Sequence, residues 1–189
     1  YKSQNISQLY TDHLNNIKEF AKNNKINLND FEKDFSDLTA NNSVSTYLLL
    51  NIVLKKGLPI DIESSELTLE HVMPETAEFS NPGDNWYDES FLGTNPNPSG
   101  PSGAELNEEV HKLYLDRVGN HTILKNTHNI ANSNKAYVDK KDIFKKYGTD
   151  GITKGATDLA VLSFSKWDAI AIEKRQKSLA DQAKKIWAF

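Results

Sequence analysis

The feature that most constrains this sequence is a short apolar stretch in which a carboxylate and an imidazole are neighbours. In residues 67–74, two leucines and the β-branched Thr68 alternate as they do in a strand, and Pro74 ends the run. Glu70 and His71 lie just before the point where the backbone must turn. The stretch therefore delivers both chemical groups to the end of one strand.

A second stretch, about fifty residues later, completes the first. Residues 121–125 predict another strand, which continues into a helix that carries Asn129. Gly119 and Asn120 come just before that strand. A strand with Glu-His, a strand with Gly-Asn and a helix with a further Asn form an order of parts that resembles a ββα-metal nuclease, also called HNH or His-Me finger.

The remainder of the chain is predicted to be mostly helical. Apolar residues recur at helical spacing over the first twenty-odd residues, and Ser43 is expected to cap a helix over 44–56. Further helices are expected near 102–117, 127–140, 139–147 and 167–186. The predicted fold class is therefore α+β, mostly helical, with a small two-stranded ββα-metal core.

Three parts are expected, which together form one compact unit. Residues 1–60 make a helical N-terminal part, 61–150 hold the nuclease core, and 151–189 supply a helix that packs on it. Within the core, residues 75–103 are rich in turn-forming residues and are expected to form a long loop. Because the chain starts at Tyr1 in a helical pattern, we expect a fragment of a longer protein.

Composition excludes several kinds of site. The absence of cysteine removes disulfides, thiolate zinc sites and cysteine nucleophiles, and it agrees with a reducing, cytoplasmic location. No apolar run approaches the roughly 18 residues of a membrane span, so no membrane partner is expected. Residues 66–110 contain ten Asp and Glu but no Lys or Arg, whereas residues 111–189 contain fifteen Lys and Arg against eight Asp and Glu. The basic part could attract phosphate, although ordinary solvated faces would give the same counts.

The residue types at the two strand ends suit phosphodiester hydrolysis. A neutral histidine such as His71 can act as general base near pH 7. Asn120 can accept a hydrogen bond from the other ring nitrogen and so fix the tautomer. Glu70 and Asn129 offer hard oxygen ligands, which suit Mg²⁺, with Mn²⁺ as a substitute, better than zinc. Since consecutive strand residues point to opposite faces, Glu70 and His71 share a site only if the strand breaks at His71.

Two lysines and two histidines near the motifs each allow more than one interpretation. Lys135 and Lys140, five residues apart on the helix expected beside the site, are either phosphate contacts or part of an exposed helix face. His121 could compete as ligand or base if it faced the site, but alternation along its strand predicts that it faces away. If Asn129 lay on the far side of its helix, His128 would be the ligand to examine.

Together, the motifs resemble the C-terminal HNH-like nuclease domain of GmrSD-type modification-dependent restriction enzymes and related phage-defence proteins. The resemblance covers roughly residues 45–189 and rests on Glu-His-x-x-Pro-Glu, Gly-Asn-x-Thr-x-Leu and Asn129. One departure is His121, where this family usually has leucine. The resemblance implies metal-dependent DNA cleavage with His71 as base. It also implies a nucleotide-hydrolysing N-terminal domain, which senses the DNA modification, as a partner.

These inferences predict a divalent-metal-dependent DNA endonuclease of a bacterial phage-defence or restriction system, with a solvent-facing site. The alternatives are a non-catalytic nucleic-acid-binding module of the same fold and an RNase. The expected roles are catalysis for His71 and Asn120, metal binding for Glu70 and Asn129, and DNA binding for Lys135 and Lys140.

Overall fold

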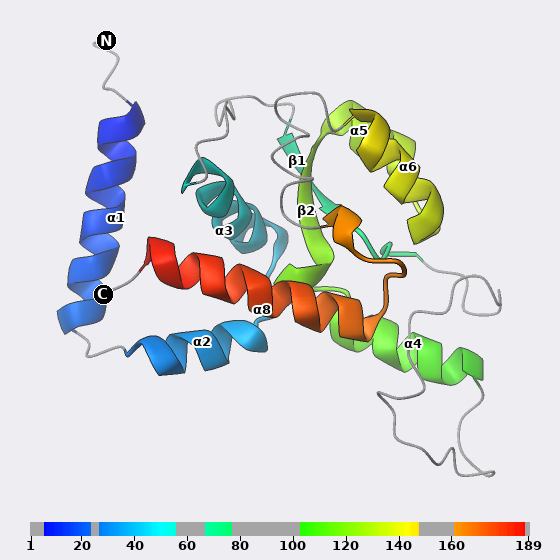
Figure 1. The fold of residues 1–189 in the computed structure, drawn as a ribbon, viewed down its shortest axis with the longest axis horizontal. Helices are drawn as coiled ribbons and strands as arrows, with labels where there is room; N and C mark the ends of the chain where they lie inside the picture. Colours follow the sequence, from blue (N-terminus) through cyan, green and yellow to red (C-terminus); the bar gives the residue numbers. More distant parts are fainter. Residues whose placement is uncertain (1–5, 24–26, 56–66, 77–102, 148–160, 188–189) are drawn as a thin grey trace.

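Helices surround a small antiparallel sheet in the computed structural model (Figure 1), which confirms the predicted α+β class. Among the described residues, no helix is both long and apolar enough to cross a membrane. The described residues are 6–23, 27–55, 67–76, 103–147 and 161–187. In chain order the elements are α1 (Ile6–Asn23), α2 (Leu28–Ser36), α3 (Asn42–Lys55), β1 (Leu67–His71), α4 (Gly103–Tyr114), the 3₁₀ turn η1 (Val118–Asn120), β2 (His121–Lys125), α5 (Asn126–Asn132), α6 (Tyr137–Tyr147), the 3₁₀ turn η2 (Val161–Ser163) and α8 (Ala169–Ile186).

The two predicted strands pair over their whole length. They run antiparallel, so that His71 at the end of β1 lies opposite His121 at the start of β2. β2 is covered on both faces, because Ile123 packs into one apolar cluster and Leu124 into the other. The alternation of side chains along β2 therefore joins two halves of the core.

Helix α8 also contributes to both clusters. It crosses the molecule with α2 and α3 packed against it (Figure 1). Asp168 caps its N-terminus, since the carboxylate accepts a hydrogen bond from the N–H of Ala171 at 2.8 Å. Ile172 lies in the cluster with Leu124, and Leu179 lies in the cluster with Ile123. The buried residues of α8 therefore form one stripe at helical spacing.

Gly119 lies directly against α8, just before the second strand. Its N–H donates to Gln176 Oε1 at 3.0 Å, and its carbonyl accepts from Arg175 Nη1 at 2.5 Å. Arg175 is buried, and its guanidinium lies over the Trp167 ring. These contacts fix the position of the start of β2 relative to α8.

Replacing Gly119 with alanine should destabilise the fold by about 1–3 kcal/mol, the usual effect of overpacking. The added Cβ would lie 2.4 Å from the Ile172 carbonyl oxygen and 2.8 Å from Gln176 Cβ, and the first of these is backbone that cannot rotate away. Urea unfolding would measure the change. Lys177→Ala, on the exposed side of α8, is the control and should change the free energy of unfolding by less than about 0.5 kcal/mol.

The prediction of a single helix over 127–140 is wrong. α5 ends at Asn132, and α6 begins only at Tyr137. Ser133 has a φ of 44°, which ends the first helix in the left-handed region. Polar side chains at Asn132 and its two successors compete for backbone hydrogen bonds and favour such a break. Lys135 therefore lies between the helices, not on one helix with Lys140.

The start of α3 also differs from the prediction. The side chain of Asn41 accepts the N–H of Val44 at 3.0 Å, so Asn41 caps this helix in place of Ser43. Most of the long loop predicted over 75–103 lies outside the described residues.

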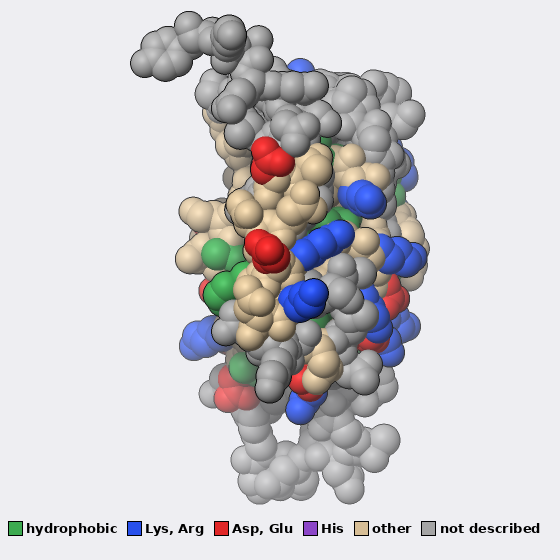
Figure 2. Space-filling model, turned by 90° about the vertical axis from the view of Figure 1, so that its left-hand side faces the viewer, with side chains coloured by type: hydrophobic (Ala, Val, Ile, Leu, Met, Phe, Trp, Pro, Cys, Tyr) green, Lys and Arg blue, Asp and Glu red, His purple; other side chains and the backbone are tan. Residues whose placement is uncertain are grey.

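Charges of both signs share the face of the molecule seen in Figure 2. Lys and Arg side chains lie there beside Asp and Glu side chains. The described part of this face is therefore not a continuous basic surface of the kind that binds nucleic acid without regard to sequence.

Candidate active site

A pocket of about 180 Å³ lies beside the end of β1. β1, the turn after it, α5, α6 and the connection between these helices all contribute to its walls. Four of the six predicted site residues line it, whereas Asn120 and Lys135 do not. The lining residues are Asn42, Leu69, Glu70, His71, Pro74, Glu75, Asn129, Ser133, Asn134 and Lys140.

Glu70 and His71 both reach this pocket although β1 stays regular through His71. Among the described residues, β1 pairs only with β2, so its other edge is open to side chains. At that edge Asn129 Nδ2 donates to the Leu69 carbonyl at 2.8 Å. Lys140 Nζ donates to the His71 carbonyl at 2.7 Å. β1 ends at His71, as the expected break requires, and the pocket lies beside the strand edge, where side chains from both faces can reach it.

His71 has the properties of a general base. Its side chain is 8% exposed, so the site is more enclosed than the solvent-facing one expected. Burial lowers the pKa of His71 below its ordinary value, and the nearby carboxylates of Glu75 and Asp116 oppose this shift. The imidazole is therefore neutral near pH 7 and has a lone pair with which it can accept a proton.

The two nitrogens of His71 have different surroundings. Nε2 is enclosed, has no hydrogen-bond partner among the described residues and lies 3.9 Å from Asp116 Oδ1. Nδ1 lies 3.6 Å from Oε1 of Glu75, an exposed residue that lines the pocket. Nδ1 is therefore the nitrogen nearer to a water in the pocket.

The sequence analysis missed both of these carboxylates, Glu75 and Asp116. Glu75 was part of a motif without a role, and Asp116 approaches His71 only through the fold.

Glu70 and Lys140 form a buried ion pair. Lys140 Nζ lies 2.6 Å from Glu70 Oε1, and the two side chains are 1% and 4% exposed. Burial raises the pKa of Glu70 and lowers the pKa of Lys140, while their contact opposes both shifts. Lys140 is thus neither an exposed phosphate contact nor part of an exposed helix face. The break at Ser133 re-orients α6, which turns this lysine toward β1.

The sequence predicted that Asn120 orients the ring of His71, but the structure gives its side chain other hydrogen-bond partners. Its Oδ1 accepts the N–H of Met73 at 2.7 Å and the indole N–H of Trp167 at 3.0 Å. Its Nδ2 donates to the carbonyls of Met73 at 3.1 Å and Leu115 at 2.9 Å. These four bonds use the whole capacity of the amide. Asn120 therefore fixes the turn that follows His71.

Asn129 lies on the same side of α5 as the pocket, as the metal hypothesis requires. Its Nδ2 donates to Thr68 Oγ1 at 3.0 Å as well as to the Leu69 carbonyl. Both amide hydrogens point to β1, so Oδ1 is the atom left to coordinate an ion. With a carboxylate oxygen of Glu70, this donor set fits a hard cation such as Mg²⁺, which keeps several waters.

His121 lies against His71, contrary to the prediction that it faces away. The two ring centroids are 4.4 Å apart and the planes nearly perpendicular. Its Nδ1 lies 2.8 Å from Ser45 Oγ and its Nε2 lies 3.1 Å from the Leu115 carbonyl. Burial lowers the pKa of His121 to about 3, so this ring is neutral. Alternation failed as a guide because Asn120 belongs to the η1 turn and not to the strand.

Comparison with known proteins identifies one family. Residues 22–182 match the family described as "GmrSD restriction endonucleases, C-terminal domain". Neither the curated proteins nor the solved structures give a significant match. The matched range includes β1, β2, α5 and every residue of the pocket beside β1. The resemblance that the sequence motifs suggested is thus confirmed, and the chain belongs to the family of GmrSD restriction endonuclease C-terminal domains.

Proposed function

We propose that this domain hydrolyses DNA phosphodiester bonds with a divalent metal ion, as an HNH (His-Me finger) endonuclease. The observation that carries the proposal is a single pocket in which a neutral His71 meets the oxygen donors Glu70 and Asn129. The family to which the chain belongs supports nuclease activity. In a cell, the domain would serve restriction or phage defence beside an N-terminal nucleotide-hydrolysing sensor domain.

His71 would take the proton of the attacking water at Nδ1, the nitrogen nearer to the pocket. The imidazolium formed in this way is stabilised by two carboxylates, Glu75 at 3.6 Å and Asp116 at 3.9 Å. Asn120 supports the step at a distance, because it fixes the backbone that follows His71. The general base is thus positioned by β1 and the turn behind it.

Glu70 and Asn129 would hold the metal ion, Mg²⁺ or Mn²⁺. When bound, the ion supplies stabilisation of the negative charge on the scissile phosphate and the leaving oxygen. Lys140 keeps the Glu70 carboxylate at the pocket wall through its 2.6 Å contact. Two protein oxygens make a weak site, so tight binding is expected only when a DNA phosphate is present as a further ligand.

Lys135 remains our candidate for a phosphate contact. It is exposed and follows two residues of the pocket wall, Ser133 and Asn134. Its Nζ donates to the Ala131 carbonyl at 2.7 Å, a bond that a phosphate oxygen at the pocket rim could replace. A contact of this kind would strengthen binding to every DNA sequence alike.

Digestion of supercoiled plasmid and of structured RNA would test the proposal. We expect plasmid cleavage with Mg²⁺ and with Mn²⁺, and none with EDTA, because the phosphate charge then lacks its metal. Cleavage of RNA alone would indicate an RNase of the same fold. DNA binding without cleavage under any metal condition would indicate a non-catalytic module. Cleavage that persists in EDTA would refute the role of the metal.

A further inference from the structure

We propose that His71, His121 and Asp116 bind a divalent transition-metal ion such as Zn²⁺, and that this ion blocks the nuclease. The site lies at Nε2 of the His71 ring, whereas Nδ1 lies near Glu75, which lines the pocket described above. The binding of the ion stands on the geometry alone. The blocking effect rests on the proposed function, because it requires that His71 be the general base.

The three side chains offer a suitable set of donors. Each contributes one ligand atom, and the three atoms lie within 4.8 Å of one another. The enclosed Nε2 of His71 has no hydrogen-bond partner among the described residues and lies 3.9 Å from Asp116 Oδ1. Two imidazole nitrogens with one carboxylate oxygen suit Zn²⁺, Co²⁺ or Ni²⁺, unlike the all-oxygen set proposed for Mg²⁺. Three protein ligands leave a fourth position for water.

His121 already has the support that a metal-bound histidine needs. Its Nδ1 can donate to Ser45 Oγ at 2.8 Å, since the Ser45 hydroxyl in turn donates to the Ala40 carbonyl. In the structure Nε2–H can donate to the Leu115 carbonyl at 3.1 Å, so an ion would replace this bond and the ring proton would move to Nδ1. A partner on the second ring nitrogen fixes the tautomer and the ring orientation of metal-binding histidines.

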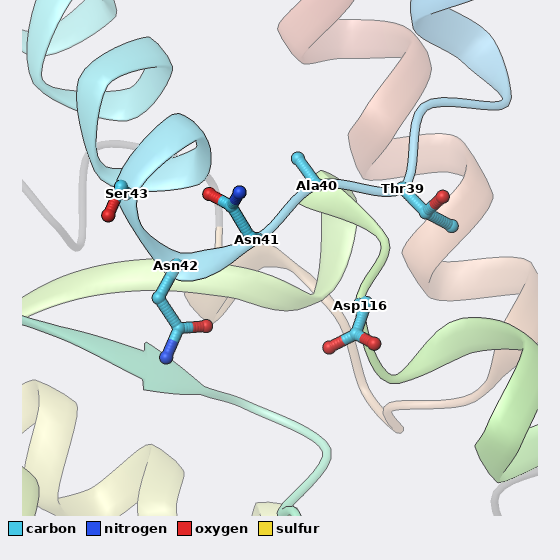
Figure 3. A pocket seen from close by; sticks show the side chains of 6 residues that line it. All are labelled: Thr39, Ala40, Asn41, Asn42, Ser43 and Asp116. Carbon is cyan, nitrogen blue, oxygen red and sulfur yellow. The ribbon is translucent and has the colours of Figure 1, made fainter.

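An ion can reach these donors from solvent. Asp116 is 63% exposed and lines a pocket of about 550 Å³ with the start of α3 (Figure 3). Zinc bonds of about 2.0–2.2 Å bring ligand atoms closer together than they lie here, so the site must contract when it binds an ion. The exposed Asp116 side chain can supply part of this movement by rotating, and the His121 ring must turn its Nε2 away from the Leu115 carbonyl.

The ion would inhibit through the tautomer of His71. A metal on Nε2 leaves the single ring proton on Nδ1, which is the nitrogen nearer to the catalytic pocket. Nδ1 is then a hydrogen-bond donor without a lone pair, and it cannot take a proton from water. The two metals would therefore have opposite effects. Mg²⁺ would support cleavage of the substrate, whereas a transition metal on Nε2 would stop His71 from acting as the base.

Metal binding to the apo domain tests the site without any reference to cleavage. Equilibrium dialysis should find one Zn²⁺ per chain, and Co²⁺ should give the visible absorption of a tetrahedral complex. Asp116→Ala should weaken the affinity by about tenfold or more, as the loss of even an outer partner does. Asp142→Ala, which removes an exposed carboxylate on α6, is the control and should leave the affinity unchanged. His121→Asn, checked for its fold by circular dichroism, should weaken binding as well.

The result that would overturn the site is the absence of stoichiometric Zn²⁺, or Zn²⁺ binding that Asp116→Ala leaves unchanged. The blocking effect is tested by plasmid cleavage at fixed Mg²⁺ with increasing Zn²⁺, each variant normalised to its own rate without Zn²⁺. Wild type should lose activity at Zn²⁺ concentrations that Asp116→Ala tolerates. Equal inhibition of both would refute the blocking effect through this site. If Zn²⁺ binds through Asp116 but no DNA is ever cut, the proposed function fails and the metal site stands.

Discussion

His71→Ala should lower the rate of DNA cleavage by about 10²–10⁴-fold, the usual contribution of a positioned general base. The variant keeps the oxygen donors of the pocket but has no group that accepts the proton of water. Single-turnover cleavage of plasmid under saturating Mg²⁺ would measure the loss. Because His71 is buried against His121, we also expect a lower melting temperature, and the assays must run well below it.

His128→Ala is the control for this experiment. His128 lies on α5 next to Asn129, yet it is not part of the pocket wall, so its removal should preserve most of the cleavage rate. A folded His71→Ala protein that nicks DNA at nearly the wild-type rate would contradict the assignment of the base. A large loss in His128→Ala instead would point to an active site on another side of α5.

Lys140→Met should lower the free energy of unfolding by about 3–5 kcal/mol, the usual cost of breaking a buried ion pair on one side. The substitution leaves the Glu70 carboxylate buried without its ammonium partner and removes the donor to the His71 carbonyl. Urea unfolding at pH 7 would measure the change. The double variant Glu70→Gln with Lys140→Met should recover part of the loss, because no unpaired charge remains.

Lys145→Met on the same helix provides the comparison. Lys145 pairs with Asp142 at 3.1 Å, but both side chains are exposed, so its loss should cost at most about 1 kcal/mol. If Lys140→Met costs no more than Lys145→Met, Glu70 does not depend on its partner. The buried pair would then have no structural importance.

The parts of this fold that the sequence predicts are those set by local periodicity. The alternation of Leu67 and Leu69 with polar neighbours is sufficient for a strand, and the apolar spacing after Asp168 is sufficient for α8. The end of α5 carried a weaker signal. Asn132 and Ser133 have low helix propensity but are neither Gly nor Pro, so the break was missed.

Long-range pairing explains the remaining differences at the site. Lys140 meets Glu70 across 70 residues of sequence, and nothing in the local pattern distinguishes it from a surface lysine. An amide such as that of Asn120 can serve a ring or a backbone equally well, and only the folded turn decides between them. The residue types at the pocket were therefore predictable, whereas the partner of each one was not.

Among the described residues no second strand pairs with β1 on its other edge, and this has a consequence for solubility. An unpaired strand edge is a template on which another chain can add a strand and begin to aggregate. Here the side chains of Asn129 and Lys140 occupy the Leu69 and His71 carbonyls and so deny that edge to an intruding chain. Residues at the proposed site thus also guard against self-association. If a variant at either position is insoluble, the loss of this protection explains the result, and the variant gives no information on catalysis.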